Sequence, residues 1–248
     1  MKALTLRQIK TALSLEDRPQ PVLGPDDVLV LLEAAALNRR DYWITQGMYP
    51  GISLPVVLGS DGAGVVTQTG SAVGNFWLDR QVIINPGLDW GTNPAAQSPE
   101  FNILGMPRDG TFATEVAIPA TQLHAKPEHL DWQQAAALPL SGVTAWRACF
   151  TQGGLRAGQS VLITGIGGGV ATFALQFAVS AGAVVWVTSS SEAKIQRAIE
   201  LGAQGGFDYT RDDWQKQLTA AAGPIELIID SAGGSGYPTL LDAAAPGG

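Results

Sequence analysis

The stretch SVLITGIGGGVATFALQFAVSA, residues 160–181, decides the fold of this chain. It begins with a short apolar run at 161–163 that is rich in β-branched residues, as a buried strand of a parallel sheet requires. Glycines follow at once at 165–169, and an apolar segment with helical spacing comes next. A strand, a glycine turn and a helix in this order form the context of a dinucleotide-binding fingerprint.

The glycine turn, beginning at Gly165, is the first candidate binding site. Glycine permits a tight turn and a close approach of backbone to a diphosphate, and the helix N-terminus offers unpaired N–H groups. An ordinary strand–helix turn is the alternative. The helix is predicted to bury one face, made of Val170, Phe173, Ala174, Phe177, Ala178 and Ala181.

The residues after this stretch repeat its pattern. Apolar runs and helical spacing predict a strand, helix, strand, helix and strand at 183–188, 192–201, 206–209, 212–221 and 226–230. A complete doubly wound sheet usually has about six strands, and this part of the chain is predicted to have four. We therefore expect a Rossmann sheet truncated after its fourth strand, which is left as an exposed edge.

The tip of the second strand indicates which cofactor is bound. A site for NAD usually places Asp or Glu there to bind the ribose 2′-hydroxyl. Here Ser189 and Ser190 occupy the tip, and Lys194 follows. Hydroxyl donors and a cation without a carboxylate suit a 2′-phosphate, so these residues predict NADPH rather than NADH. A compatible alternative is that Ser191 caps the helix and Lys194 lies on a solvated face.

Composition excludes several classes of protein. The chain has 248 residues, of which 46% are hydrophobic and 15% charged, and its net charge is −7. An acidic chain without basic blocks is a poor nucleic-acid or anionic-membrane binder. The single cysteine, Cys149, allows neither an internal disulfide nor a cysteine zinc cluster. No signal peptide or membrane span is visible, so a cytoplasmic location is expected.

The first 120 residues differ from the remainder because they are β-rich, with short strands and a long loop at 85–110. We predict a β domain at 1–125 and an α/β domain at 126–248. Trp90 and Phe101 in the long loop either cover the substrate or serve packing.

Six short motifs show a family resemblance. They are ALNRRD at 36–41, LGSDGAGVV at 58–66, DGTFA at 109–113, AALP at 136–139, GVTA at 142–145 and the turn at 165–171. Together they resemble the medium-chain dehydrogenase/reductase superfamily over essentially the whole chain. The branch that is most similar is the zinc-free one, with its quinone oxidoreductase-like and zinc-type alcohol dehydrogenase-like proteins.

The resemblance implies a GroES-like substrate domain packed on a Rossmann domain, with the active site in the cleft between them. It implies that a missing C-terminal tail supplies the last strands of the catalytic domain and the dimer edge, so that the full-length form is a homodimer. It assigns the diphosphate-binding backbone to Gly167, Gly168, Gly169 and Val170. It also places Thr144 on the nicotinamide side of the cofactor and Tyr209 beside the 2′-phosphate.

The resemblance also allows the zinc question to be asked position by position. Zinc members place Cys, His and Cys where Asn38, Ser60 and Leu140 stand, and none of these three is a good zinc ligand. The loop at 85–105, which carries four cysteines in those relatives, has none. His124 and His129 are expected at the surface. The prediction is therefore an enzyme without a metal.

Without a Lewis acid, side-chain donors must stabilise the charge that develops on a carbonyl oxygen. Asn38 is the first candidate: as a helix N-cap it would use its amide oxygen and leave its NH₂ group for the substrate. Tyr42 is the second, as a hydrogen-bond or proton donor, with simple packing as the alternative. Arg39 and Arg40 are expected to be solvated, and Asp41 to complete the cap.

Ser60 and Asp61 are expected to be vestigial. The predicted function is NADPH-dependent reduction of a quinone, an enone or an aldehyde-type carbonyl. The alternatives are an alcohol dehydrogenase acting on a small alcohol and a nucleotide-binding protein without catalysis.

Overall fold

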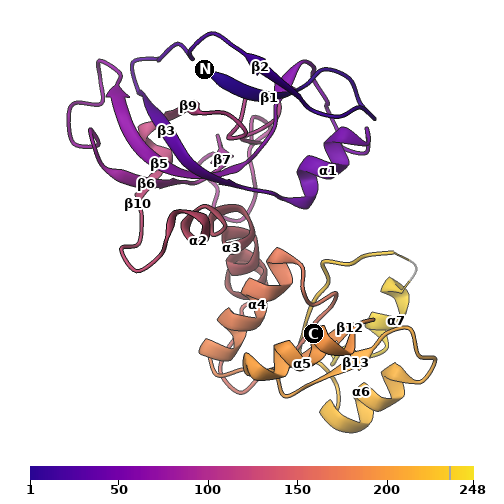
Figure 1. Cartoon of the computed structure of the whole chain (residues 1–248). Coiled ribbons are helices and arrows are strands. Elements are labelled where there is room, and N and C mark those ends of the chain that lie inside the picture. The colour runs from indigo at the N-terminus through magenta and orange to yellow at the C-terminus, as the bar shows by residue number, and fades with distance from the viewer. Residues whose placement is uncertain (235) are drawn as a thin grey trace. The chain divides into compact units, whose positions relative to one another are not determined.

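The computed structural model describes residues 1–234 and 236–248, and it divides the chain into two compact units, Met1–Leu140 and Ser141–Gly248 (Figure 1). This division comes after the boundary predicted at residue 126. The cause is α2 (Trp132–Ala136), whose Ala135 and Ala136 are buried with Ala63 of a strand in the first unit. An apolar helix face that packs on a sheet belongs with that sheet.

The first unit consists mainly of short antiparallel strands. Its sheets have the orders β10-β6-β5-β3-β9, β2-β1-β4 and β7-β8. The strands are β1 (Lys2–Leu6), β2 (Ser14–Asp17), β3 (Asp27–Ala36), β4 (Val56–Val57), β5 (Asp61–Thr69), β6 (Gln81–Ile84), β7 (Gly87–Leu88), β8 (Asn102–Ile103), β9 (Glu115–Pro119) and β10 (Leu123–Ala125). The helices are α1 (Arg39–Thr45), the 3₁₀ turn η1 (Ala120–Gln122) and α2.

Alternation within these strands builds the core of the first unit. In β9, for example, Val116 and Ile118 are buried while their neighbours are half-buried. They join Val28, Val30 and Val66 in one cluster. Period-two burial of this kind is typical of an antiparallel sheet with one face on the core.

The second unit is a parallel sheet with helices on both faces, which confirms the predicted Rossmann class. Its order is β13-β12-β11-β14, so β14 is an edge strand, as expected. The strands are β11 (Ser160–Ile163), β12 (Val184–Ser189), β13 (Gly205–Asp208) and β14 (Leu227–Ile229). The helices are α3 (Pro139–Trp146), the π-helix η2 (Arg147–Gln152), α4 (Gly169–Ser180), α5 (Glu192–Glu200), α6 (Trp214–Ala222) and α7 (Tyr237–Leu241).

Strand β11 shows how the two faces of this sheet are covered. Val161 and Ile163 pack in the cluster that holds residues of α4 and α5, whereas Leu162 packs with Leu218 of α6 and Leu240 of α7. A strand that is apolar on both faces lies at the centre of such a three-layer arrangement. The continuous apolar run therefore predicted this position correctly.

The buried face of α4 differs from the predicted one. Ala171, Ala174, Leu175 and Ala178 are fully buried, and Phe173 and Phe177 are only partly buried. The small alanines allow the helix to lie close to the sheet. The rings instead stack on each other, with centroids 6.0 Å apart. The helical period was predicted correctly, but the buried face of α4 is rotated away from the two phenylalanines.

Other expectations concern the surface and the long loop. His124 and His129 are exposed, as predicted. The long loop contains the short hairpin β7–β8, and Trp90 and Phe101 pack edge to face with centroids 4.9 Å apart. Across the described part of the chain, none of the helices has the length and apolarity that crossing a membrane requires.

Candidate functional site

The glycine turn between β11 and α4 has the backbone that the sequence predicts. Gly165 and Gly167 have φ of 62° and 104°, in the region that disfavours other residues. A Cβ atom on Gly167 would come within 2.9 Å of Cδ and 3.5 Å of Nζ of Lys194. Lys194 therefore lies beside the turn, although it comes from the next helix along the chain.

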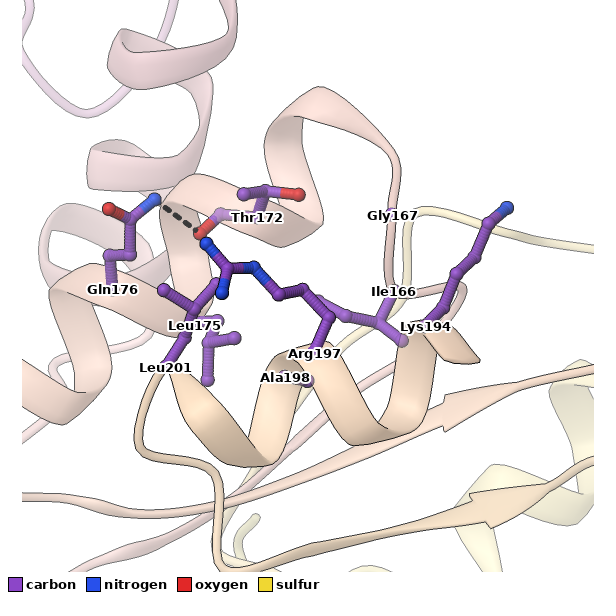
Figure 2. Close-up of a pocket in the computed structure, with 9 residues that line it drawn as sticks. All are labelled: Ile166, Gly167, Thr172, Leu175, Gln176, Lys194, Arg197, Ala198 and Leu201. Carbon is purple, nitrogen blue, oxygen red and sulfur yellow. Dashed lines mark hydrogen bonds between the residues drawn. The ribbon is translucent and has the colours of Figure 1, made fainter. Parts of the chain in front are cut away.

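A groove of about 350 Å³ lies between α4 and α5 next to this turn (Figure 2). Two of its lining residues are cations, Lys194 and Arg197, and no lining residue is acidic. The other residues are Ile166, Gly167, Thr172, Leu175, Gln176, Ala198 and Leu201. Arg197 also donates to the Glu200 carboxylate at 2.8 Å. Sequence reasoning missed Arg197, although its place one helical turn after Lys194 puts both on one face of α5.

The tip of β12 presents hydroxyl groups. Ser189 is buried and accepts a hydrogen bond from the backbone of Ser191 at 3.1 Å, while Ser190 is exposed. In the neighbouring strand Asp208 stands in register with Ser189, and Tyr209 follows it with 49% of its surface exposed. Hydrogen bonds from the backbone and hydroxyl of Thr210 lower the pKa of Asp208.

Helix α3 also reaches the glycine turn. A Cβ atom on Gly169 would meet the Ser141 hydroxyl at 2.5 Å, so a larger residue there would require the Ser141 side chain to shift. Thr144 is exposed three residues further along α3, on the same side of the helix as Ser141. The structure thus brings α3 and α5 to the turn from two separate parts of the chain.

The first unit holds a second cluster, which is built from buried polar side chains. Asp61 is 1% exposed, and its two oxygens accept from the Asn38 amide at 2.9 Å and from the Leu140 backbone at 2.8 Å. The NH₂ group of Asn38, which we expected to be left for substrate, therefore uses one of its two hydrogens to donate to Asp61. The expectation that Asp61 is vestigial was wrong for the same reason.

Asp41 completes the cap of α1, as predicted. It forms a capping box with Asn38, whose backbone N–H donates to its carboxylate at 2.8 Å.

Burial raises the pKa of Asp61 to about 6 despite the bonds from Asn38 and Leu140. Burial raises the pKa of Asp41 as well.

Arg40 is buried at 8% exposure, which corrects the expectation that it is solvated. Its guanidinium donates to the Ser60 hydroxyl at 2.7 Å and to the Leu104 carbonyl at 2.8 Å, and it also bonds the Met106 carbonyl at 3.3 Å. The Ser60 hydroxyl donates to Leu104 at 2.8 Å. Ser60 therefore has a structural role, because it joins the Arg40 guanidinium to the Leu104 carbonyl, and the expectation that it is vestigial was wrong. Arg39, one residue earlier, is exposed as expected.

Tyr42, the other catalytic candidate, lies on α1 and is 58% exposed. Its ring packs edge to face on Trp43, with centroids 5.0 Å apart. The structure shows Tyr42 at the surface of α1 but leaves its chemical role a prediction.

Comparison with known proteins identifies the family. The "Alcohol dehydrogenase GroES-like domain" family matches residues 24–128, and the "Zinc-binding dehydrogenase" family matches residues 169–248. The zinc-type alcohol dehydrogenase-like protein YogA of Leptosphaeria maculans is 38% identical over 97% of this chain and 72% of its own length. The chain belongs to the medium-chain dehydrogenase/reductase superfamily.

Other members of this superfamily are similar over most of the chain. An acryloyl-coenzyme A reductase of Sulfurisphaera tokodaii is 31% identical, covering the whole of this chain and 75% of its own. A quinone oxidoreductase of Pseudomonas aeruginosa is 30% identical over 91% of this chain and 64% of its own. A solved NAD-dependent alcohol dehydrogenase, 38% identical, matches with a TM-score of 0.93 over 99% of this chain and 75% of its own. This superfamily member is thus a nicotinamide-dependent oxidoreductase.

The residues present do not fit the zinc ion that the name of one matching family implies. Asn38 and the Leu140 backbone both donate to Asp61, and the Leu140 side chain is a hydrocarbon. The Ser60 hydroxyl is bonded to a guanidinium, a cation. Zinc in proteins is bound by Cys, His and carboxylate ligands. Within the described ranges, no three His, Cys, Asp or Glu side chains are grouped to hold a metal.

Proposed function

We propose that this superfamily member uses NADPH to reduce a quinone, an enone or an aldehyde-type carbonyl, and that it does so without zinc. The observation that supports NADPH is the position of Lys194 beside Gly167, next to a strand tip that carries Ser189 and Ser190 and no carboxylate. A 2′-phosphate placed there would meet a cation and hydroxyl donors. Tyr209, after the next strand, is proposed to flank the same phosphate.

The chain's own residues contribute to the reaction by binding and orienting the cofactor and by polarising the substrate oxygen. When bound, the reduced nicotinamide supplies the hydride. The backbone of Gly165 and of residues 167–170 is proposed to hold the diphosphate, and Thr144 on α3 to contact the nicotinamide side. Asn38 is proposed to donate to the oxygen on which charge develops, and Tyr42 to supply a hydrogen bond or proton.

The fixed orientation of Asn38 supports this role. Its amide nitrogen is bonded to Asp61, and its backbone is bonded to Asp41. A donor that is already oriented need not reorganise as charge develops. The relatives that are named acryloyl-coenzyme A reductase and quinone oxidoreductase support a conjugated carbonyl as substrate class.

The cofactor proposal is tested by replacing Lys194 with alanine. Lys194→Ala should raise the Kd for NADPH by about tenfold or more, because a charge-assisted hydrogen bond contributes roughly 1.5–3 kcal/mol, and should leave the Kd for NADH within about twofold. Titration followed by tryptophan fluorescence measures both. Lys216→Ala, an exposed lysine on α6, is the matched control. An equal loss of affinity for the two nucleotides would contradict a 2′-phosphate role.

A second candidate function is oxidation of a small alcohol with NAD. The solved structure named as an NAD-dependent alcohol dehydrogenase, with its TM-score of 0.93, favours it. Assay of quinones, enones, aldehydes and small alcohols with each nucleotide distinguishes the two. Elemental analysis that finds one tightly bound zinc per chain would reject the metal-free proposal. The homodimeric full-length form and the cytoplasmic location stay predictions.

A further inference from the structure

The strand order of the parallel sheet reverses its direction next to β11. From β11 the chain goes outward to β12 and β13, and then returns to place β14 on the other side of β11. In open α/β sheets, ligands bind outside the carboxyl ends of the strands at this switch point. The carboxyl ends of β11 and β14 therefore flank this switch point, and the glycine turn follows β11 directly.

Asp230 joins these two carboxyl ends. It follows β14, and its Oδ1 accepts a hydrogen bond of 2.5 Å from the hydroxyl of Thr164, the residue that follows β11. The same oxygen accepts from the backbone N–H groups of Ala232 at 3.0 Å and Gly233 at 3.1 Å. One carboxylate oxygen thus holds the turn that follows β14 and also links this turn to the end of the neighbouring strand β11.

The segment held by Asp230 lies against the glycine turn. A Cβ atom on Gly165 would come within 3.3 Å of the Cβ of Ala232. The Ser231 hydroxyl donates to the Thr164 carbonyl at 3.4 Å, which adds a second link between the two segments. Burial opposes ionisation of Asp230, but the bonds from Thr164, Gly233 and Ala232 bring its pKa below the ordinary value. The carboxylate is therefore charged at neutral pH.

We infer that Asp230 is a positioning residue of the nicotinamide-dinucleotide site: through Thr164 and the 231–233 backbone it sets the wall of the crevice opposite the glycine turn. This inference rests on the proposed binding of the diphosphate by the glycine turn. It concerns the part of the cofactor that NADH and NADPH share, so Asp230 affects both nucleotides alike. No local pattern in the sequence distinguishes Asp230 from the other residues of the predicted strand at 226–230.

The chain contains a matched carboxylate at the opposite ends of the same two strands. Glu226 precedes β14, and its Oε2 accepts from the backbone N–H of Ser160 at 2.9 Å and from the Ser160 hydroxyl at 3.4 Å. Ser160 is the first residue of β11. Glu226 therefore links β11 and β14 as Asp230 does, but at the amino ends of the strands, where the fold places no ligand.

The test compares Asp230→Ala with Glu226→Ala in the full chain, with NADPH and NADH as probes. Asp230→Ala should raise the Kd for both nucleotides about tenfold, because the half-buried carboxylate that holds the 231–233 segment by three hydrogen bonds is lost, whereas Glu226→Ala should change them less than about twofold. Urea denaturation should show that both variants fold. Asp230→Asn keeps an acceptor oxygen for the three donors, so its Kd should lie between those of wild type and Asp230→Ala. Thr164→Val, which removes only the cross-strand bond, should also be intermediate.

Two results would overturn the inference. One is an Asp230→Ala variant that binds both nucleotides as wild type does. The other is an equal loss in Asp230→Ala and Glu226→Ala, which would mean that linking the strands at either end is a matter of stability alone. The NADPH proposal is judged separately, by the wild-type preference between the nucleotides, and an absent preference leaves the contrast between the two variants intact.

Discussion

The first unit buries charge, whereas the second unit buries almost none. Arg40, Asp41 and Asp61 are at most 8% exposed. Among the described residues of the second unit, the buried polar side chains are all hydroxyls, those of Thr164, Thr188 and Ser189. Its candidate site depends on backbone shape at the glycine turn and on cations at the surface. The first site is thus held by desolvated charges that must be bonded, and the second by local conformation.

The strongest test of this contrast is the loss of the buried cation. Arg40→Met should lower the free energy of unfolding by about 3 kcal/mol, because it removes donors from buried acceptors and leaves two buried carboxyls without a nearby positive charge. Chemical denaturation measures the change. Arg39→Met, at the exposed neighbour, should change it by less than about 0.5 kcal/mol. Similar losses in the two variants would show that the burial of Arg40 contributes nothing special.

A second test uses pH. The folded-state pKa of Asp61 is about 6, above its ordinary value of 3.8, so its contribution to stability is full below pH 3.8 and is lost as pH rises through 6. The loss should amount to roughly 3 kcal/mol relative to Asp61→Asn, which cannot ionise. Denaturation of both proteins from pH 4 to pH 7 measures it. Asp41, whose pKa is also raised, titrates in both proteins.

The second unit supplies the control for this pH dependence. Hydrogen bonds from Gln217 and Arg211 lower the pKa of Asp213. Its contribution is therefore present above its unfolded pKa and lost as pH falls, so Asp213→Asn should alter the pH dependence in the opposite sense. Parallel curves for wild type and Asp61→Asn would refute the raised pKa.

The smallest expected effect concerns the backbone of the second site. Gly167→Ala should cost roughly 1–2 kcal/mol of stability because φ is 104°. It should raise the Kd for both NADPH and NADH, because the added methyl group distorts the turn proposed to bind the diphosphate that the two nucleotides share. Gly158→Ala, with φ of 83° and no atom within 4 Å of the added Cβ, carries the same strain away from the turn. Its cofactor affinity should stay that of wild type. Equal changes in cofactor affinity in Gly167→Ala and Gly158→Ala would contradict the proposal that the glycine turn binds the cofactor.

The two sites also differ in how much of them the sequence predicted. The glycine turn, the four parallel strands and the hydroxyl-rich tip of β12 were found because each is encoded within a few consecutive residues. Arg197 was missed, although its spacing from Lys194 was visible. The buried face of α4 was predicted incorrectly, because helical periodicity counts apolar residues and takes no account of whether their side chains fit in the space above the sheet.

The partners in the first unit were beyond local reasoning. Asp61 meets Asn38 and Leu140, which lie 23 and 79 residues away, and Arg40 meets Leu104, which lies 64 residues away. No local pattern distinguishes a solvated arginine from one whose acceptors arrive on a distant loop.

By itself, then, the sequence determined the superfamily, the parallel sheet and the glycine turn, since strand, turn and helix signals are short-range properties of the backbone. Only the tertiary structure decided that Arg40 is buried, that the Asn38 amide is bound to Asp61, and that Asp230 joins β11 to β14. Desolvation and hydrogen bonding depend on which distant groups arrive, and folding alone settles that.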